Sequence, residues 1–459
     1  MTVPKDRTSA GGAARTSADE QGAPAATAPP DPAAILRSRA YVVMLVLGAL
    51  VGVPVAVVAY FFLALVGKSQ NWVFGTLPDE LGLGRATWWP VVPLVLSGVI
   101  VALSITYLPG TGGHEPAEGL KTGGATRPID LPGIVVASLA TLCLGAVLGP
   151  EAPLIAIGSG LAVLAVLLVR RDAPQQAVMV VGAAGSFAAI ATLLGSPLTG
   201  AFLLMEAGGL GALLGVVLVP GLLAAGIGAL IFVGLDSWTG LGSFTLAVPD
   251  LPSVGAPTVA EFIWAVVIGA VAACLGALIT RGARIVQHVV VAHRLLVTPV
   301  LGLLVALLAI AFEVLTDKDS GYVLFSGQTA LPKVVDDASS WSVGALVLLI
   351  VCKSLAYSLS MSGFRGGPVF PGMFIGAALG IVLSHLPGLS MIAAVGIGIG
   401  AMTVSMLGLP LVSVLLPSLL LAGDAVQLMP LTIVGVVTSY VVSAHLRPEP
   451  TSDESPSSA

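Results

Sequence analysis

Residues 149–162 read GPEAPLIAIGSGLA, and residues 367–380 read GPVFPGMFIGAALG. In both stretches a glycine lies four residues before a proline, and an Ile-Gly pair begins four residues after that proline. Each stretch lies within apolar sequence, so its Gly and Pro residues predict a helix that begins inside a membrane. Such a helix start is tolerated only where protein or a water-filled cavity satisfies its free backbone groups. The two stretches therefore predict a polar site enclosed by apolar helices.

A second pair of stretches follows the first. Residues 181–198 read VGAAGSFAAIATLLGSPL and residues 395–411 read VGIGIGAMTVSMLGLPL, and each ends in Gly-x-Pro-Leu. The prolines of the two motifs are 44 residues apart in one half of the chain and 39 in the other. This order favours an internal repeat, the plan of many membrane transporters. The alternative is a chance match within apolar sequence that is rich in Gly and Pro.

The composition predicts a membrane protein. Hydrophobic residues make up 56% of the chain and charged residues 9%, with a mean hydropathy of +1.02, whereas a soluble domain carries about 25% charged residues. We therefore predict an all-α, polytopic fold of two inverted-topology repeats with broken, tilted helices.

Spans need about 20 apolar residues, and the candidates are 41–66, 90–107, 132–148, 153–169, 213–235, 258–280, 296–315, 342–360, 371–385, 390–407 and 428–445, with shorter broken pieces at 196–207 and 409–423.

The turn-rich interval DSWTGLGSFTLAVPDLPSVGAP, residues 236–257, marks the boundary between the halves. Both ends of the chain are polar and rich in Pro, Ser and Ala, which is typical of disordered tails, and the first has no signal-peptide core. The predicted organisation is an N-terminal tail (1–36), a first membrane half (37–236), a linker (237–257), a second membrane half (258–446) and a C-terminal tail (447–459).

Basic residues predict the orientation, because Lys and Arg favour the cytoplasmic side of a span. Five of them precede the first span, at Lys5, Arg7, Arg15, Arg37 and Arg39. A second basic loop is expected around Arg281, Arg284 and Arg294. We predict a multi-pass protein of the cell (inner or plasma) membrane with cytoplasmic termini.

No arrangement typical of an enzyme is present in the sequence. The cysteines, Cys143, Cys274 and Cys352, lie far apart in apolar stretches, which indicates neither a disulfide framework nor a metal cluster. There is no Ser-His-Asp pattern, HExxH or nucleotide loop, and the net charge of −5 and lack of basic runs indicate no nucleic-acid partner. We predict no cofactor, no metal and no enzymatic activity.

Three segments carry the Gly and Pro residues required at broken helix ends: GTGGHEP (110–116), GPEAP (149–153) and GGPVFP (366–371). A helix start directs unpaired N–H groups and roughly half a positive charge outward. Two or three such ends together form an anion site without a cationic side chain. Conduction requires this weak binding, because a tightly held ion does not leave.

These segments resemble the three filter motifs of the CLC family of chloride channels and proton-coupled chloride transporters, which have the forms GSGIP, GKEGP and GxFxP. The resemblance covers about residues 40–445, and residues 358–380 are similar to the region of the third motif. It implies chloride or a similar small anion as the substrate, and a homodimer with one pathway per subunit. The fluoride-selective branch usually has an Asn in its first motif, and this chain has none there.

By this resemblance Glu151 is the gating glutamate, which occupies the anion's position when ionised and leaves when protonated or displaced. An intramembrane carboxylate at a helix start competes with an anion for the same N–H groups. The alternative is an ordinary first-turn residue at the membrane surface. The flanking Gly149, Pro150 and Ala152 are expected to bind the anion.

In the first motif, Thr111 corresponds to the family's central filter serine, and Gly112 follows it as an anion-binding position. Gly113 and His114 replace the usual Ile and Pro. His114 is either a group that changes charge near neutral pH or a solvated loop residue.

In the third motif, Val369 stands where the family has Phe and Phe370 where it has Ala, and their backbone N–H groups are expected to face the anion. Arg365 and Lys353 flank this motif. They either steer anions by their field or extend toward the membrane boundary.

Two departures from the family bear on mechanism. Glu206 matches one family glutamate, but the next position, where proton-coupled members carry an internal acid, is Ala207. Glu206 is read as a structural residue at a helix end or as part of a proton path. Family members usually supply a tyrosine ligand from beyond the last span, but no tyrosine follows Tyr440 here, so this ligand is either absent or replaced.

The leading hypothesis is channel-like conduction of chloride through a pathway gated by glutamate. The alternative is proton-coupled anion exchange, with Glu206, His114 or a water chain in place of the missing acid. A carrier of another family with inverted repeats, and an intramembrane enzyme, are the remaining hypotheses.

Overall fold

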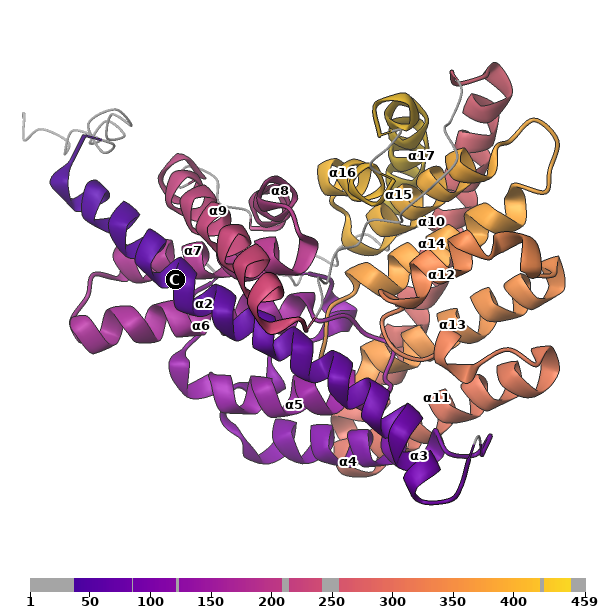
Figure 1. Ribbon diagram of the computed structural model, residues 1–459, viewed down its shortest axis with the longest axis horizontal. Helices are drawn as coiled ribbons and strands as arrows, with labels where there is room; N and C mark the ends of the chain where they lie inside the picture. Colours follow the sequence, from indigo (N-terminus) through magenta and orange to yellow (C-terminus); the bar gives the residue numbers. More distant parts are fainter. Residues whose placement is uncertain are drawn as a thin grey trace, which may run out of the picture.

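A computed structural model describes residues 37–84, 86–120, 124–208, 214–241, 256–421 and 425–446. The described residues form helices and loops with no strand, and the first and second halves of the chain lie side by side (Figure 1). The all-α prediction is confirmed. The predicted tails, and residues 242–255 of the predicted linker, lie outside the described residues.

The first half begins with α2, a long helix that crosses the front of the view in Figure 1. Its helices are α2 (Arg39–Asn71), α3 (Leu77–Glu80), α4 (Val91–Tyr107), α5 (Leu131–Cys143), α6 (Glu151–Val169), α7 (Gln175–Leu194), α8 (Pro197–Ala207) and α9 (Leu214–Thr239). Short turns are η1 (Trp72–Thr76), η2 (Pro109–Gly112), η3 (Pro116–Glu118) and η4 (Pro128–Asp130).

The second half has a similar order of long and short helices. They are α10 (Val259–Ala292), α11 (Arg294–Thr316), α12 (Ala330–Asp336), α13 (Val343–Gly363), α14 (Val369–Leu383), α15 (Met391–Leu407), α16 (Pro410–Leu420) and α17 (Ala425–Leu446), with short turns η6 (Ser320–Tyr322) and η7 (Ala338–Ser340). The halves contact each other through α4 with α11 and through α8 with α16.

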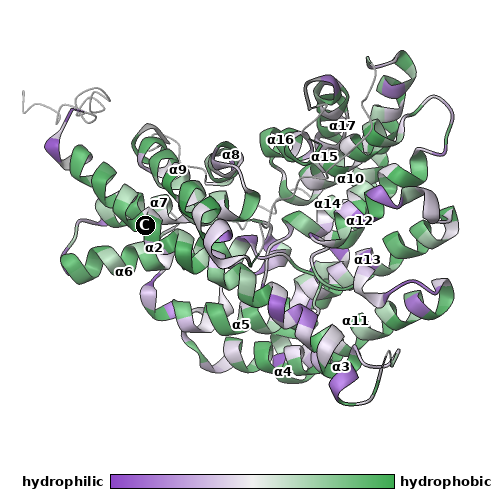
Figure 2. Ribbon diagram, in the orientation of Figure 1, coloured by the Kyte–Doolittle hydropathy of each residue, from purple (hydrophilic) through white to green (hydrophobic). Residues whose placement is uncertain are grey.

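Eight of the described helices are long and apolar enough to cross a membrane, and six more are shorter apolar helices. Green, hydrophobic residues cover the helices in Figure 2, and many large apolar side chains are exposed, including Leu50 at 63% and Leu230 at 73%. Exposed apolar surface on this scale fits a lipid environment rather than water. The chain is therefore a multi-pass membrane protein.

Several predicted boundaries are wrong. Helix α7 is a candidate span that was not among the spans predicted from the sequence. Helix α10 continues through Arg281 and Arg284 to Ala292, so these arginines lie on a helix and not in a loop. The predicted span 132–148 ends as a helix at Cys143, because residues 144–150 form the loop that leads to α6.

The close packing of two helix pairs supports the internal repeat. Helices α6 and α7 cross where Gly158 meets Gly185, and α14 and α15 cross where Gly376 meets Gly398. At each of the four glycines an added Cβ would collide with the carbonyl oxygen of the partner glycine. These glycines lie in the two repeated motifs, so the same sequence pattern makes the same crossing in both halves.

Replacing Gly376 by leucine is expected to push α14 away from α15. Overpacking of a close contact costs about 1–3 kcal/mol, and here the added side chain meets backbone. Gly344, near the start of α13, has open space around it, so Gly344→Leu is the matched control. Thermal unfolding in detergent, followed by tryptophan fluorescence, should show a lower midpoint for G376L alone. Equal midpoints would contradict the packing role.

Candidate functional site

The loops before α6 and α14 pair with each other in the protein interior. The N–H of Gly149 donates to the carbonyl of Gly367 at 2.7 Å, and the N–H of Gly367 donates back at 2.6 Å. Each helix then follows a proline in nearly the same conformation, Pro150 with φ −82° and ψ 0° and Pro368 with φ −92° and ψ −2°. The pairing satisfies backbone N–H and carbonyl groups of two loops that lie in apolar surroundings, and it brings two helix starts together.

Glu151 lies at this junction with its side chain wholly buried. Its Oε1 accepts a hydrogen bond from the backbone N–H of Phe370 at 2.8 Å, in the first turn of α14. Its Oε2 is buried and has no hydrogen-bond partner among the described residues. The surface alternative for Glu151 is therefore wrong, because burial and a partner in the other half hold this carboxylate in the interior.

The two glycines of the paired loops leave room for this carboxylate. A Cβ added to Gly149 or Gly367 would collide with the carboxylate oxygens of Glu151. The Glu151 carboxyl group thus fills a space next to the backbone N–H of Phe370 at the start of α14.

The third motif is enclosed by protein. Val369 and Phe370 are each 1% exposed, and the hydroxyl of Tyr357 on α13 donates to the carbonyl of Pro368 at 2.8 Å. The sequence interpretation missed Tyr357, although a buried tyrosine hydroxyl usually requires a partner. Tyr440 is 43% exposed on α17, and none of the described hydrogen bonds links it to these loops.

The first motif forms a turn and not the start of an α-helix. Its residues 110–113 all have positive φ, including Thr111 at 49°, and this conformation cannot continue a right-handed helix. The next helical segment is the three-residue turn Pro116–Glu118. The prediction of a third helix start is therefore wrong. Thr111 is exposed, and Gly112 beside it is buried.

Arg365 connects the first motif to the third. Its side chain is buried, with Nε donating to the carbonyl of Thr111 at 3.1 Å and Nη2 to Oε1 of Glu115 at 2.9 Å. Nη1 donates to the carbonyl of Phe364 at 3.3 Å. Of the two alternatives for Arg365, extension toward the membrane boundary is wrong, because its guanidinium bonds hold it in the interior. Glu115 was not identified as a site residue from the sequence.

Lys353 is also buried and not extended toward the boundary. Its Nζ donates to the carbonyls of four successive residues, Tyr322 to Phe325, at 2.9 to 3.3 Å. It also lies 4.4 Å from the ring centroid of Phe374 on α14. Lys353 therefore organises the loop after η6, since the lysine supplies donors to carbonyls that no helix or strand satisfies.

The two residues predicted for a proton path form hydrogen bonds that do not involve Glu151. The Glu206 carboxylate accepts from the backbone N–H groups of Leu411 at 2.8 Å and Val412 at 3.0 Å, so it caps the start of α16. His114 Nε2 lies 2.5 Å from the carbonyl oxygen of Gly119, within its own loop. Neither contact leads to Glu151, and the structural interpretation of Glu206 has the better support.

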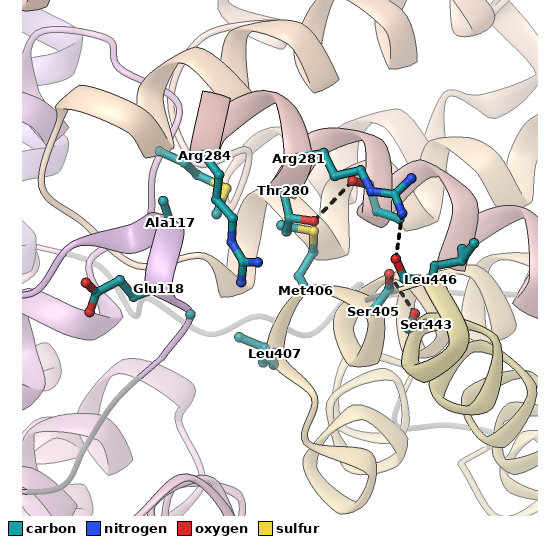
Figure 3. A pocket seen from close by; sticks show the side chains of 13 residues that line it. Ala117, Glu118, Thr280, Arg281, Arg284, Ser405, Met406, Leu407, Ser443 and Leu446 are labelled. Atoms are coloured by element: carbon teal, nitrogen blue, oxygen red, sulfur yellow. Dashed lines mark hydrogen bonds between the residues drawn. The ribbon is translucent and has the colours of Figure 1, made fainter. Parts of the chain in front are cut away.

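A cavity of about 150 Å³ lies next to the first motif, between η3, α10, α13, α15 and α17. Arg281 and Arg284 project from α10 toward it, and Arg281 donates to the carbonyl of Leu446 at 2.7 Å (Figure 3). The lining also includes Glu118 and the hydroxyls of Ser405 and Ser443. Two arginines and two serine hydroxyls thus lie beside apolar side chains in this cavity.

The described residues contain no group of three or more His, Cys, Asp or Glu side chains arranged to hold a metal ion. The groups gathered at the site are the buried Glu151 carboxyl group, backbone N–H groups and one buried arginine, Arg365.

Comparison with solved structures identifies the fold. A crystal structure of a slow cyanobacterial Cl−/H+ antiporter has a TM-score of 0.71 at 19% identity, covering 89% of this chain and 95% of that one. A CLC-type fluoride/proton antiporter has a TM-score of 0.64 at 22% identity, covering 88% and 96%. These likenesses show that the fold is that of CLC transporters.

Sequence comparison gives the same family. "Putative ion-transport protein YfeO" of Escherichia coli O7:K1 is 26% identical over 361 residues, which cover 76% of this chain and 81% of that protein. The family model described as voltage gated chloride channel matches residues 98–444. Because this match covers more than half of the chain, the chain belongs to the voltage-gated chloride channel (CLC) family of membrane anion transport proteins.

Proposed function

We propose that this protein exchanges a chloride-like anion for protons across the cell membrane through a pathway closed by Glu151. The observation that carries the proposal is the buried Glu151 carboxylate on the N–H of Phe370 at 2.8 Å. An ionised carboxylate there competes with an anion, and a protonated one does not. One site therefore binds either the anion or the charged form of Glu151, which links proton binding to anion binding.

This proposal replaces the preference for channel-like conduction drawn from Ala207. Two similar solved structures are described as Cl−/H+ and fluoride/proton antiporters, which supports exchange better. Since Glu206 and His114 have partners of their own, we propose that protons reach Glu151 along water and not through these side chains. Channel-like conduction remains the second candidate, supported by the absence of an acid at residue 207.

We also propose a homodimer with cytoplasmic termini in the inner or plasma membrane. The short helices α8 and α16, joined by Glu206, expose Leu198 at 63% and Leu411 at 59%. We propose that a second copy of the chain covers the apolar face that these two short helices form.

The first test measures anion and proton movement together. Purified protein in liposomes loaded with KCl is expected to release chloride when valinomycin is added, with proton uptake in a fixed ratio to chloride. Chloride and pH electrodes record both fluxes, and protein-free liposomes are the control. Chloride release without proton movement would support the channel, and no release of chloride or other small anions would exclude both functions.

Glu151→Gln is expected to abolish proton coupling while chloride flux continues, because glutamine has a similar shape but neither carries a proton nor competes as an anion. The pH dependence of chloride flux should disappear with the coupling. Glu261 is a suitable control, since it is also buried near a helix start and caps α10. Glu261→Gln should keep coupled transport, and a coupled Glu151→Gln variant would refute the gate.

Glu206→Gln is expected to lower stability without removing proton coupling. Its carboxylate caps α16 through two N–H groups, and losing a helix cap costs about 1 kcal/mol. The thermal midpoint in detergent should therefore fall while the ratio of proton to chloride flux stays that of the unaltered protein. Loss of proton flux with normal chloride flux would instead assign Glu206 to the proton path.

A further inference from the structure

Backbone N–H groups provide less positive potential at the first motif than at the other two. No α-helix begins among the described residues between α4 and α5, and Thr111 lies in a turn with positive φ. Glu151 and Val369, by contrast, each begin a helix of more than ten residues. The part of the pathway next to Thr111 therefore needs another source of positive charge to attract an anion.

Arg365 supplies a cation at this place. Its guanidinium donates to the carbonyl of Thr111, and its Cγ lies 3.3 Å from where a Cβ on Gly112 would be. Arg365 is only two residues before Gly367, whose backbone pairs with Gly149. One arginine side chain thus holds the first motif against the junction of the other two.

Glu115 offsets part of this charge. Its Oε1 lies 2.9 Å from Nη2 of Arg365 and 3.9 Å from Nη2 of Arg294, and its Oε2 accepts from Gln287 at 2.5 Å. The contacts of this cluster join two guanidinium groups to the Glu115 carboxylate, and a second carboxylate, Glu118, lies near enough to act on the charge of Arg365. A bare arginine would retain an anion too strongly for rapid release, so the carboxylate weakens binding to a level that permits conduction.

We propose that the Arg365–Glu115 pair sets the affinity of the pathway for anions next to Thr111, with Arg365 also positioning the Thr111 turn. The proposal rests on the anion transport proposed above and adds the residues that determine its affinity. A pair with this role differs from a purely structural ion pair in one respect. Removing the carboxylate and removing the guanidinium should change anion affinity in opposite directions.

The test is calorimetric chloride binding by purified protein, together with chloride flux in liposomes. Glu115→Gln keeps an acceptor for Arg365 but removes a negative charge, so the chloride Kd should fall by about tenfold and flux should slow with release. Arg365→Gln should raise the Kd by about tenfold. Arg365→Lys keeps the charge and should bind chloride nearly as the unaltered protein does.

The double variant E115Q/R365Q removes both charges and should bind chloride with a Kd between those of the single variants. The double variant is also a control for misfolding of Arg365→Gln, because in that single variant Glu115 has lost its nearest buried partner. If both single variants weaken binding and lower the thermal midpoint alike, the pair is structural and the inference is wrong. If the unaltered protein neither binds nor transports chloride, bromide, nitrate or fluoride, the proposed function itself fails.

Discussion

Gly149 and Gly367 satisfy each other's backbone in the middle of an apolar protein, and the geometry of the site depends on that pairing. A membrane provides no water for interrupted helices, so a loop at depth needs protein partners. Two loops that bond to each other meet this requirement together. They also bring the start of α14 to Glu151, whose carboxylate then has the N–H of Phe370 as its partner. The same glycines leave the space that the carboxylate fills.

The buried cations are satisfied in two different ways. Lys353 binds four carbonyls and an aromatic face, whereas Arg365 binds a carboxylate and two carbonyls. A buried charge is costly without such partners. The difference matters for function, because Lys353 organises a loop while Arg365 reaches the first motif. We propose that this charged side chain acts on the anion together with the helix starts.

The sequence predicted the broad architecture well because apolar composition and repeated motifs are local properties. It was less successful at boundaries. Helix α7 is rich in Ala and contains two Gly, so it stood out as a repeated motif and not as an apolar run. The arginines of α10 indicated a loop, yet exposed polar residues are compatible with the end of a long helix. Glycines in the first motif indicated a helix start, but glycine permits left-handed turns equally well.

The sequence by itself determined that the chain spans a membrane, that its motifs recur in two halves and that Glu151 begins a helix within apolar sequence. Only the tertiary structure decided which groups meet. Glu151 bonds to a residue 219 positions away, and Arg365 to a carboxylate 250 positions away. A buried charge in a sequence shows that a partner is needed, because desolvation is costly whatever the fold. It does not show which partner, since this depends on how distant helices pack.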